Sequence, residues 1–151
     1  MIKELKNLLQ QVATITQKNN ELLDATGGRF NMFHICGVNH YENTHSAIIA
    51  ELLNPKGTHS LKSELLKAFL SLIDKDFVLT DFNPSNATVY TEYTTDNGRI
   101  DILIEDDQKN ALIIENKIYA PDQREQLKRY NQYAQKQYKA YKIYYLTLLG
   151  D

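Results

Sequence analysis

The chain has 151 residues, 42% of them hydrophobic and 24% charged, with a formal net charge of −2. This length suits one domain with a sizeable core, and the composition is that of an ordinary soluble globular protein. The single cysteine, Cys36, excludes an internal disulfide and a cysteine-rich zinc site. No apolar run approaches the roughly 20 residues of a transmembrane helix, and no signal peptide opens the chain. We therefore expect a cytoplasmic protein with no membrane partner.

The first half of the chain is patterned as helices. A helix over residues 1–24 is predicted to end before Gly27-Gly28, and it could pack on the domain or form a homodimer. Further helices are expected over 42–53, before Asn54-Pro55, and over 60–73. The helical spacing of the first segment rests on Ile2, Leu5, Leu8, Leu9, Val12 and Ile15.

The second half alternates strands with one helix. Strands are predicted over 88–94, 99–104 and 111–118, and the last two form a hairpin. A helix over 121–137 crosses to a final strand over 142–148. We therefore expect an α/β fold in one domain, residues 1–151, with a central mixed sheet of about four strands flanked by helices.

Three charged residues in the hairpin are the most informative. Strand alternation places Ile100, Ile102 and Ile104 on one face and Asp101 on the other, and it places Glu115 and Lys117 together. If the polar turn is centred near Gln108, Asp101 lies directly across from Glu115. Like charges so placed destabilise a sheet unless a cation lies between them. The pattern predicts a hard-metal site with a lysine beside it.

The alternative is an ordinary solvated strand face. Glu-x-Lys alone is common on such faces, and for Glu115 and Lys117 by themselves this reading is preferred. The predicted pairing with Asp101, behind Gly98-Arg99-Ile100, reverses the preference.

The residues Gly98-Arg99-Ile100-Asp101 and Glu115-Asn116-Lys117 resemble the motifs of the PD-(D/E)xK nuclease superfamily. Gln126 and Tyr130 match the Gln-x-x-x-Tyr signature of its RecB-like branch. Upstream, residues 41–46, 51–55 and 57–59 are similar to the Glu-x-x-His-Ser, Leu-Leu-Asn-Pro and Gly-x-His elements of a bacterial family. The resemblance implies a three-layer, restriction-endonuclease-like core that binds Mg²⁺, or Mn²⁺ in its place, and cuts nucleic acid.

The resemblance also implies a metal site. Its ligands would be Asp101, Glu115, the main-chain carbonyl of Asn116 and Glu42, and Lys117 would be catalytic. Oxygen ligands suit Mg²⁺, which takes one or two carboxylates. Glu42 also has a structural reading, as a first-turn glutamate favoured by the helix dipole.

Four further residues are candidates for substrate binding: Gln126, Tyr130, Arg99 and His45. The first two share a helix stripe, so a simple Gln–Tyr pair is the alternative. Arg99 could contact phosphate or neutralise the carboxylates, and His45 could support the site or pack. Glu92 is a reserve carboxylate.

Charge is unevenly distributed. From Lys117 onward seven Lys or Arg face three Asp or Glu, a local charge of +4, whereas the first 116 residues carry ten against sixteen, or −6. Few cations lie near the carboxylates, so we expect weak, salt-sensitive DNA binding. Members of the resembled family usually continue past the last predicted strand. We therefore expect the chain to be a fragment that is truncated at its C-terminus.

The leading prediction is an Mg²⁺-dependent nuclease that cuts DNA in bacterial restriction, repair or phage defence. The alternative is a non-catalytic module that binds nucleic acid or protein. A third reading, a helix-rich adaptor assembled through residues 1–24, rests on the first helix alone.

Overall fold

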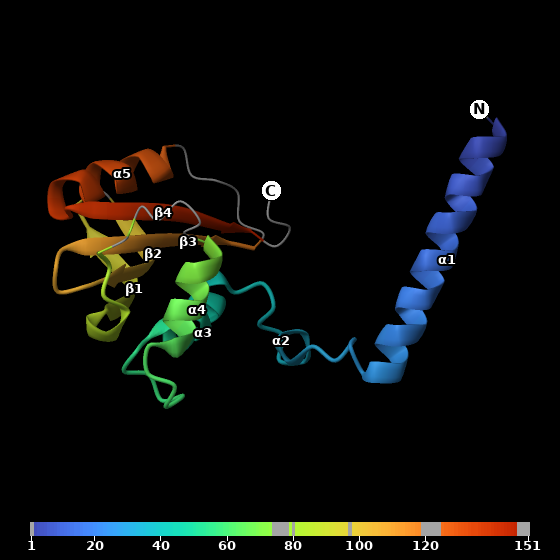
Figure 1. The fold of residues 1–151 in the computed structure, drawn as a ribbon, viewed down its shortest axis with the longest axis horizontal. Coiled ribbons are helices and arrows are strands. Elements are labelled where there is room, and N and C mark those ends of the chain that lie inside the picture. The colour runs from blue at the N-terminus through green and yellow to red at the C-terminus, as the bar shows by residue number, and fades with distance from the viewer. Residues whose placement is uncertain (1, 74–78, 80, 97, 119–124, 148–151) are drawn as a thin grey trace. The chain divides into compact units, whose positions relative to one another are not determined.

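A computed structural model describes residues 2–73, 79, 81–96, 98–118 and 125–147 (Figure 1). By their contacts the residues form two compact units, Met1–Asn39 and His40–Asp151, which are described separately. The first contains helices only, and the second contains the sheet with the remaining helices.

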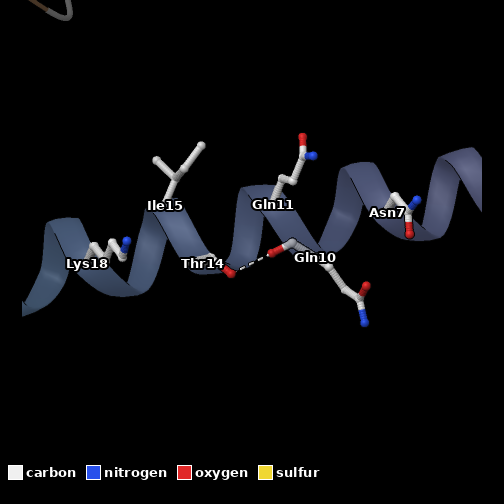
Figure 2. A pocket seen from close by; sticks show the side chains of 6 residues that line it. All are labelled: Asn7, Gln10, Gln11, Thr14, Ile15 and Lys18. Carbon is white, nitrogen blue, oxygen red and sulfur yellow. Dashed lines mark hydrogen bonds between the residues drawn. The ribbon is translucent and has the colours of Figure 1, made fainter.

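In the first unit, α1 (Ile2–Thr26) confirms the predicted helix and runs two residues further. A one-turn helix, α2 (Met32–Ile35), lies in the connector, where the Asn31 side chain caps it by accepting a hydrogen bond from the His34 amide at 3.0 Å. No described helix is long and apolar enough to cross a membrane. A hollow of about 410 Å³ on α1 is lined by Asn7, Gln10, Gln11, Thr14, Ile15 and Lys18 (Figure 2).

The second unit is built on a four-stranded mixed sheet in the order β1 (Thr88–Thr95), β2 (Gly98–Glu105), β3 (Asn110–Lys117), β4 (Ala140–Thr147). β1 and β3 pair antiparallel to β2, while β4 pairs parallel to β3. The parallel pair requires a crossover, and α5 (Gln126–Gln137) lies between the two strands in the chain. The expected fold class is confirmed.

Helices cover both faces of this sheet (Figure 1). α3 (Glu42–Leu53) and α4 (Glu64–Ile73) pack on one face, where Leu53 and Leu66 join Ile102 and Ile114 in a buried cluster. α5 covers the other face, where Tyr130 joins a second buried cluster. The sheet is therefore the middle layer of three.

The predicted strand bounds differ from the structure by one or two residues, and the predicted start of α4 differs by four. α4 begins at Glu64 rather than residue 60, because Ser60 and Lys62 adopt positive φ values of 61° and 52° that break a helix. The short 3₁₀ turn η1 (Pro84–Asn86) precedes β1. The predicted helix start at 121–124 and the last strand residue, 148, lie outside the described residues.

The predicted face of Ile100 is also wrong. Ile102 and Ile104 lie in the α3–α4 cluster, but Ile100 lies in the α5 cluster. The β1–β2 ladder pairs Thr91 with Ile102 and Tyr93 with Ile100, and between them Glu92 has a φ of 53°. This left-handed residue interrupts the ladder opposite Asp101, and the strict alternation of side chains fails there.

The turn between β2 and β3 is organised by one carboxylate, Asp106, which is 6% exposed. Its Oδ1 accepts from the amides of Gln108 and Asn110, both at 2.9 Å. Its Oδ2 accepts from the Asn83 amide and the Asn110 side chain, also at 2.9 Å. Burial raises the pKa of Asp106, but the hydrogen bonds from Asn110, Asn83 and Gln108 outweigh burial and lower it.

We expect Asp106→Ala to lower the free energy of unfolding by about 3 kcal/mol, because several buried donors lose a charged acceptor. Since the folded pKa is depressed, this stabilisation is present above the unfolded pKa of about 4 and is lost as pH falls through the folded pKa. Urea unfolding from neutral to acidic pH measures both effects. Asp107→Ala, at an exposed neighbour, is the matched control, and an equal loss in both variants would contradict the assignment.

Candidate active site

The register of the hairpin places the two motif carboxylates across from each other. β2 and β3 pair from Glu105 with Ala111 to Ile102 with Ile114. The ladder ends at Ile102, and its register, continued by one residue, sets Asp101 against Glu115, as the position of the polar turn predicts. Asp101 is held there by Oδ2, which accepts a hydrogen bond from the Asn116 amide at 2.8 Å.

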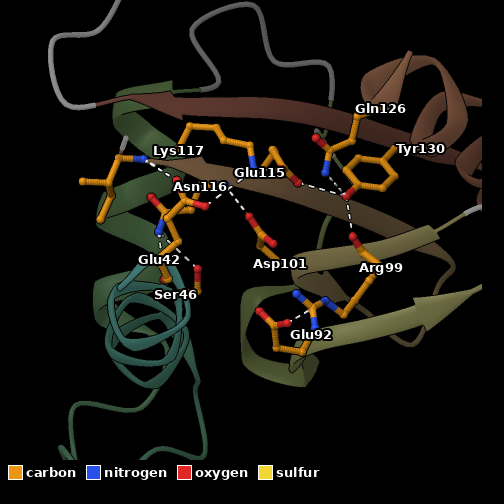
Figure 3. A network of polar contacts seen from close by, with 11 residues as sticks. Glu42, Ser46, Glu92, Arg99, Asp101, Glu115, Asn116, Lys117, Gln126 and Tyr130 are labelled. Atoms are coloured by element: carbon orange, nitrogen blue, oxygen red, sulfur yellow. Dashed lines mark hydrogen bonds and ion pairs between the residues drawn. The ribbon is translucent and has the colours of Figure 1, made fainter. Parts of the chain in front are cut away.

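Lys117 supplies the positive charge among the carboxylates (Figure 3). Together, Asp101, Glu115, Glu42 and Lys117 are called the carboxylate–lysine cluster. Its Nζ lies 2.7 Å from Oε1 of Glu115 and 3.7 Å from Oε2 of Glu42. The Lys117 side chain is 11% exposed and that of Glu115 is fully buried. One ammonium group therefore links a carboxylate on β3 with a carboxylate at the start of α3.

The start of α3 is tied to the end of β3 by three further hydrogen bonds. Oε1 of Glu42 accepts from the Ile118 amide at 2.9 Å. The Asn116 side chain donates through Nδ2 to the Glu42 main-chain oxygen at 3.2 Å and to Oγ of Ser46 at 3.1 Å. Neither Ser46 nor the Asn116 side chain has a role that the sequence predicts, although Ser46 lies one helical turn after Glu42.

Burial and charge shift the titration of all three motif residues. Burial raises the pKa of Asp101 and outweighs the Asn116 hydrogen bond and the Lys117 charge, which lower it. Burial, together with the Asp101 charge, likewise raises the pKa of Glu115 against the opposing hydrogen bond from Lys117. Burial alone would lower the pKa of Lys117, but the hydrogen bond to Glu115 and the surrounding carboxylates raise it. The cluster has more negative charge than one lysine neutralises.

Tyr130 connects α5 with the motif strands. Its hydroxyl accepts a hydrogen bond from Nε2 of Gln126 at 2.8 Å and contacts Oε2 of Glu115 at 3.0 Å and the main-chain oxygen of Arg99. Gly98 has a φ of 133°, and a Cβ atom there would lie 3.8 Å from the Tyr130 ring. Gln126 and Tyr130 are both buried. In this structure Tyr130 contacts the Glu115 carboxylate, and Gln126 holds the Tyr130 hydroxyl.

We expect Tyr130→Phe to lower turnover at this site by about 10- to 100-fold. This is the usual cost of losing a group that orients a metal-ligating side chain, here the predicted ligand Glu115. Removing the hydroxyl also leaves Gln126 and the Arg99 carbonyl without this partner, so the free energy of unfolding should fall by about 1–3 kcal/mol. Turnover and thermal unfolding measure the two effects. Tyr141→Phe removes a hydroxyl bonded to Asn131 and should leave turnover unchanged.

Two predicted residues lie beside the cluster. Nε of Arg99 forms an ion pair with Oε2 of Glu92 at 2.7 Å, and the Arg99 side chain is 58% exposed. Its charge also lowers the pKa of Asp101, which supports the neutralising role. His45 is half-buried on α3 next to Ser46. Roles of Arg99 and His45 toward a substrate stay predictions.

The segment after α3 serves the fold. Oε1 of Glu51 accepts from the Thr58 amide and hydroxyl at 2.5 and 2.7 Å, and a ring nitrogen of His59 lies 3.0 Å from the Asn54 carbonyl. At Gly57 a Cβ atom would meet the Glu51 main-chain oxygen at 2.7 Å. The Leu-Leu-Asn-Pro and Gly-x-His elements thus close a tight loop, in which His59 has a structural role.

The donor atoms of the cluster suit a divalent metal. Asp101, Glu115 and Glu42 offer carboxylate oxygens, the hard ligands that Mg²⁺ and Mn²⁺ take. Burial, with a smaller contribution from neighbouring carboxylates, raises the pKa values of Asp101 and Glu115, and a dication would favour their ionised forms. Within the described residues no group of three or more Asp, Glu, His or Cys is arranged to hold a metal. Lys117 contacts both Glu115 and Glu42. The carboxylate oxygens therefore suit a divalent metal by their chemistry, but in this structure they are arranged around the Lys117 ammonium group.

The α/β core with its mixed sheet is that of a restriction-endonuclease-like fold, and the carboxylate–lysine cluster lies on two of its strands and on α3. The family model described as the PD-(D/E)XK nuclease superfamily matches residues 30–151. The chain belongs to this superfamily, whose members are typically nucleases and generally use divalent metals. No curated protein and no solved structure matches the chain.

Proposed function

We propose that the protein is a metal-dependent deoxyribonuclease, a phosphodiesterase of the RecB-like branch. Residues 1–151 act as one nuclease domain with an N-terminal helix, in the cytoplasm of a bacterial cell and in restriction, repair or phage defence. The observation that carries the proposal is the contact of Lys117 with Glu115 and Glu42, beside Asp101 and in front of Tyr130. A structural ion pair would need only one of these carboxylates.

The roles follow from position. Asp101, Glu115, Glu42 and the Asn116 main-chain oxygen would hold the metal. Mg²⁺ or Mn²⁺, when bound, polarises the phosphodiester and activates the attacking water. Lys117 Nζ donates hydrogen bonds to oxygens on which negative charge develops as phosphorus takes up the nucleophile. Tyr130 and Gln126 keep the Glu115 carboxylate oriented. Arg99 and His45 would assist phosphate binding.

The test is cleavage of supercoiled plasmid, linear duplex and single-stranded DNA, with an RNA of the same sequence in parallel. We expect slow cleavage of DNA with Mg²⁺ or Mn²⁺ and none with EDTA. Binding of DNA or protein without cleavage under every metal condition would favour the alternative, a non-catalytic module. Fluorescence anisotropy across a salt series measures the binding, which should weaken steeply as salt rises.

We also infer a homodimer through α1, none of whose described residues is buried. Five of its apolar residues fit a heptad, in which Leu5 and Val12 share one core position with Asn19. The other core position holds Leu8, Ile15 and Leu22. A single asparagine at the first position is typical of two-stranded coiled coils. The exposed fractions of Leu8 (56%), Ile15 (68%) and Leu22 (60%) leave these side chains available to a second copy.

Light scattering after size exclusion tests the dimer. Leu8→Glu with Ile15→Glu should convert the full chain to a monomer, because buried unpaired carboxylates are strongly disfavoured. Gln10→Glu with Gln17→Glu adds the same charge on the opposite side of the helix and should leave the dimer intact. A monomeric wild type at about 100 µM, a concentration at which even micromolar affinity gives a dimer, would contradict the inference.

A further inference from the structure

One residue of β3, Asn116, holds two separate parts of the cluster with two different groups. Its main-chain amide donates to Oδ2 of Asp101 at 2.8 Å. Its side-chain amide donates to the Glu42 main-chain oxygen at 3.2 Å and to Oγ of Ser46 at 3.1 Å (Figure 3). Asn116 is 3% exposed and Ser46 is 1% exposed. A buried amide whose two donor bonds both go to one helix fixes that helix relative to its own strand.

The helix fixed in this way carries Glu42, and Glu42 is the one proposed metal ligand that does not come from the sheet. Asp101 and Glu115 are placed by the β2–β3 register, which the sheet determines. Glu42 lies 74 residues before Asn116 in the chain and reaches the cluster only through the packing of α3. A shift of about 1 Å in such a ligand is enough to impair a site. The position of α3 along β3 therefore decides whether Glu42 can join the other carboxylates.

Two hydrogen bonds, from the end of β3 and from the residue that follows it, hold Glu42 in addition to its contact with Lys117. The Asn116 side chain binds its main-chain oxygen, and the Ile118 amide binds its Oε1 at 2.9 Å. The second contact orients the carboxylate, whereas the first sets the height of the helix turn. Ser46, one turn later, accepts the second proton of the Asn116 amide and keeps that side chain in place.

We propose that Asn116 and Ser46 are positioning residues that act through Glu42 and set the affinity of the site for a divalent metal. This inference rests on the proposed function, because it takes Glu42 as a ligand. It assigns the Asn116 side chain a role separate from that of its main-chain oxygen. It also gives Ser46, which is 1% exposed, a specific hydrogen-bonding role.

The substitution Asn116→Ala separates the two functions of this residue. It removes the bonds to Glu42 and Ser46 but retains the main-chain amide that holds Asp101. The test is isothermal titration calorimetry of Mn²⁺ alone into the full chain. We expect the affinity to fall by about 10- to 100-fold, as for other groups that orient metal ligands. Asn43→Ala is the same truncation at an exposed position in the turn of α3 that Asn116 binds, and it should leave the Mn²⁺ affinity unchanged.

A comparison in a second background distinguishes positioning from a general loss of structure. If Asn116 acts through Glu42, Asn116→Ala should cause no further loss of Mn²⁺ affinity in a Glu42→Gln protein. Equal losses in both backgrounds would overturn the proposal. If Asn116→Ala fails to fold, Ser46→Ala replaces it, with an expected loss of about five-fold in the wild type and none beside Glu42→Gln.

The outcomes separate this inference from the function on which it rests. A wild-type chain that binds no Mn²⁺ would overturn the metal-dependent nuclease and this inference together. A wild type that binds Mn²⁺, with Asn116→Ala and Ser46→Ala binding it equally well, would overturn the positioning role alone.

Discussion

Replacing Asp101 with asparagine is expected to lower DNA cleavage by about 10³-fold or more, because a metal contributes several kcal/mol to transition-state stabilisation and this change removes a ligand charge. The fold should survive. Asparagine keeps an oxygen that can accept the hydrogen bond now made by the Asn116 amide at 2.8 Å. Cleavage of a labelled duplex under single-turnover conditions measures the loss.

The same substitution should leave the metal-free protein as stable as the wild type or more stable. Burial raises the pKa of Asp101 in the folded state. A carboxyl with a raised folded pKa stabilises the fold fully below its unfolded pKa, and that contribution is lost as pH rises through the folded pKa. At neutral pH the ionised Asp101 therefore costs stability, and neutral asparagine removes this cost.

Thermal unfolding in EDTA at neutral and acidic pH measures the effect. The Tm difference in favour of Asp101→Asn should shrink as pH falls, because wild-type Asp101 then becomes neutral as well. Asp96→Asn, at an exposed position outside the cluster, is the control and should change neither cleavage nor Tm. A marked drop in the Tm of Asp101→Asn, or retained cleavage, would contradict this account of the site.

The sequence predicts the hairpin register well because that register depends on local information. The polar turn around Gln108 and the β-branched runs on either side leave one pairing that buries the apolar residues, and it places Asp101 across from Glu115. The bounds of α3 follow equally from local signals, with Asn54-Pro55 ending the helix. Residues within one hairpin or one helix need no knowledge of the tertiary fold.

The sequence does not predict contacts that depend on the packing of distant elements. The bonds from Asn116 to Glu42 and Ser46 span 74 and 70 residues, and their geometry exists only after α3 docks on the sheet. The displacement of Ile100 to the α5 side depends on the left-handed backbone of Glu92 on the adjacent strand. Neither has a signature in spacing or composition.

Lys117 gives the second large expected effect, on both stability and turnover. Lys117→Met should destabilise the metal-free protein by about 3–5 kcal/mol, because it leaves the buried Glu115 carboxylate and its neighbour Glu42 without their cation. It should also slow DNA cleavage by about 10²–10³-fold, the usual cost of removing a donor that stabilises developing charge. Denaturant unfolding in EDTA and single-turnover cleavage measure the two losses.

Added metal should distinguish the two effects. Mg²⁺ should raise the Tm of Lys117→Met more than that of the wild type, because in the variant the dication is the partner that the carboxylates lack. Lys117→Arg keeps the charge and should keep most of the stability, but its larger planar group should not restore cleavage. Glu115→Gln combined with Lys117→Met should recover much of the lost stability, since the pair is then removed together. If Lys117→Met were as stable as the wild type in EDTA, the ammonium would not be the counter-ion of this cluster, and the carboxylates would have to be held neutral instead.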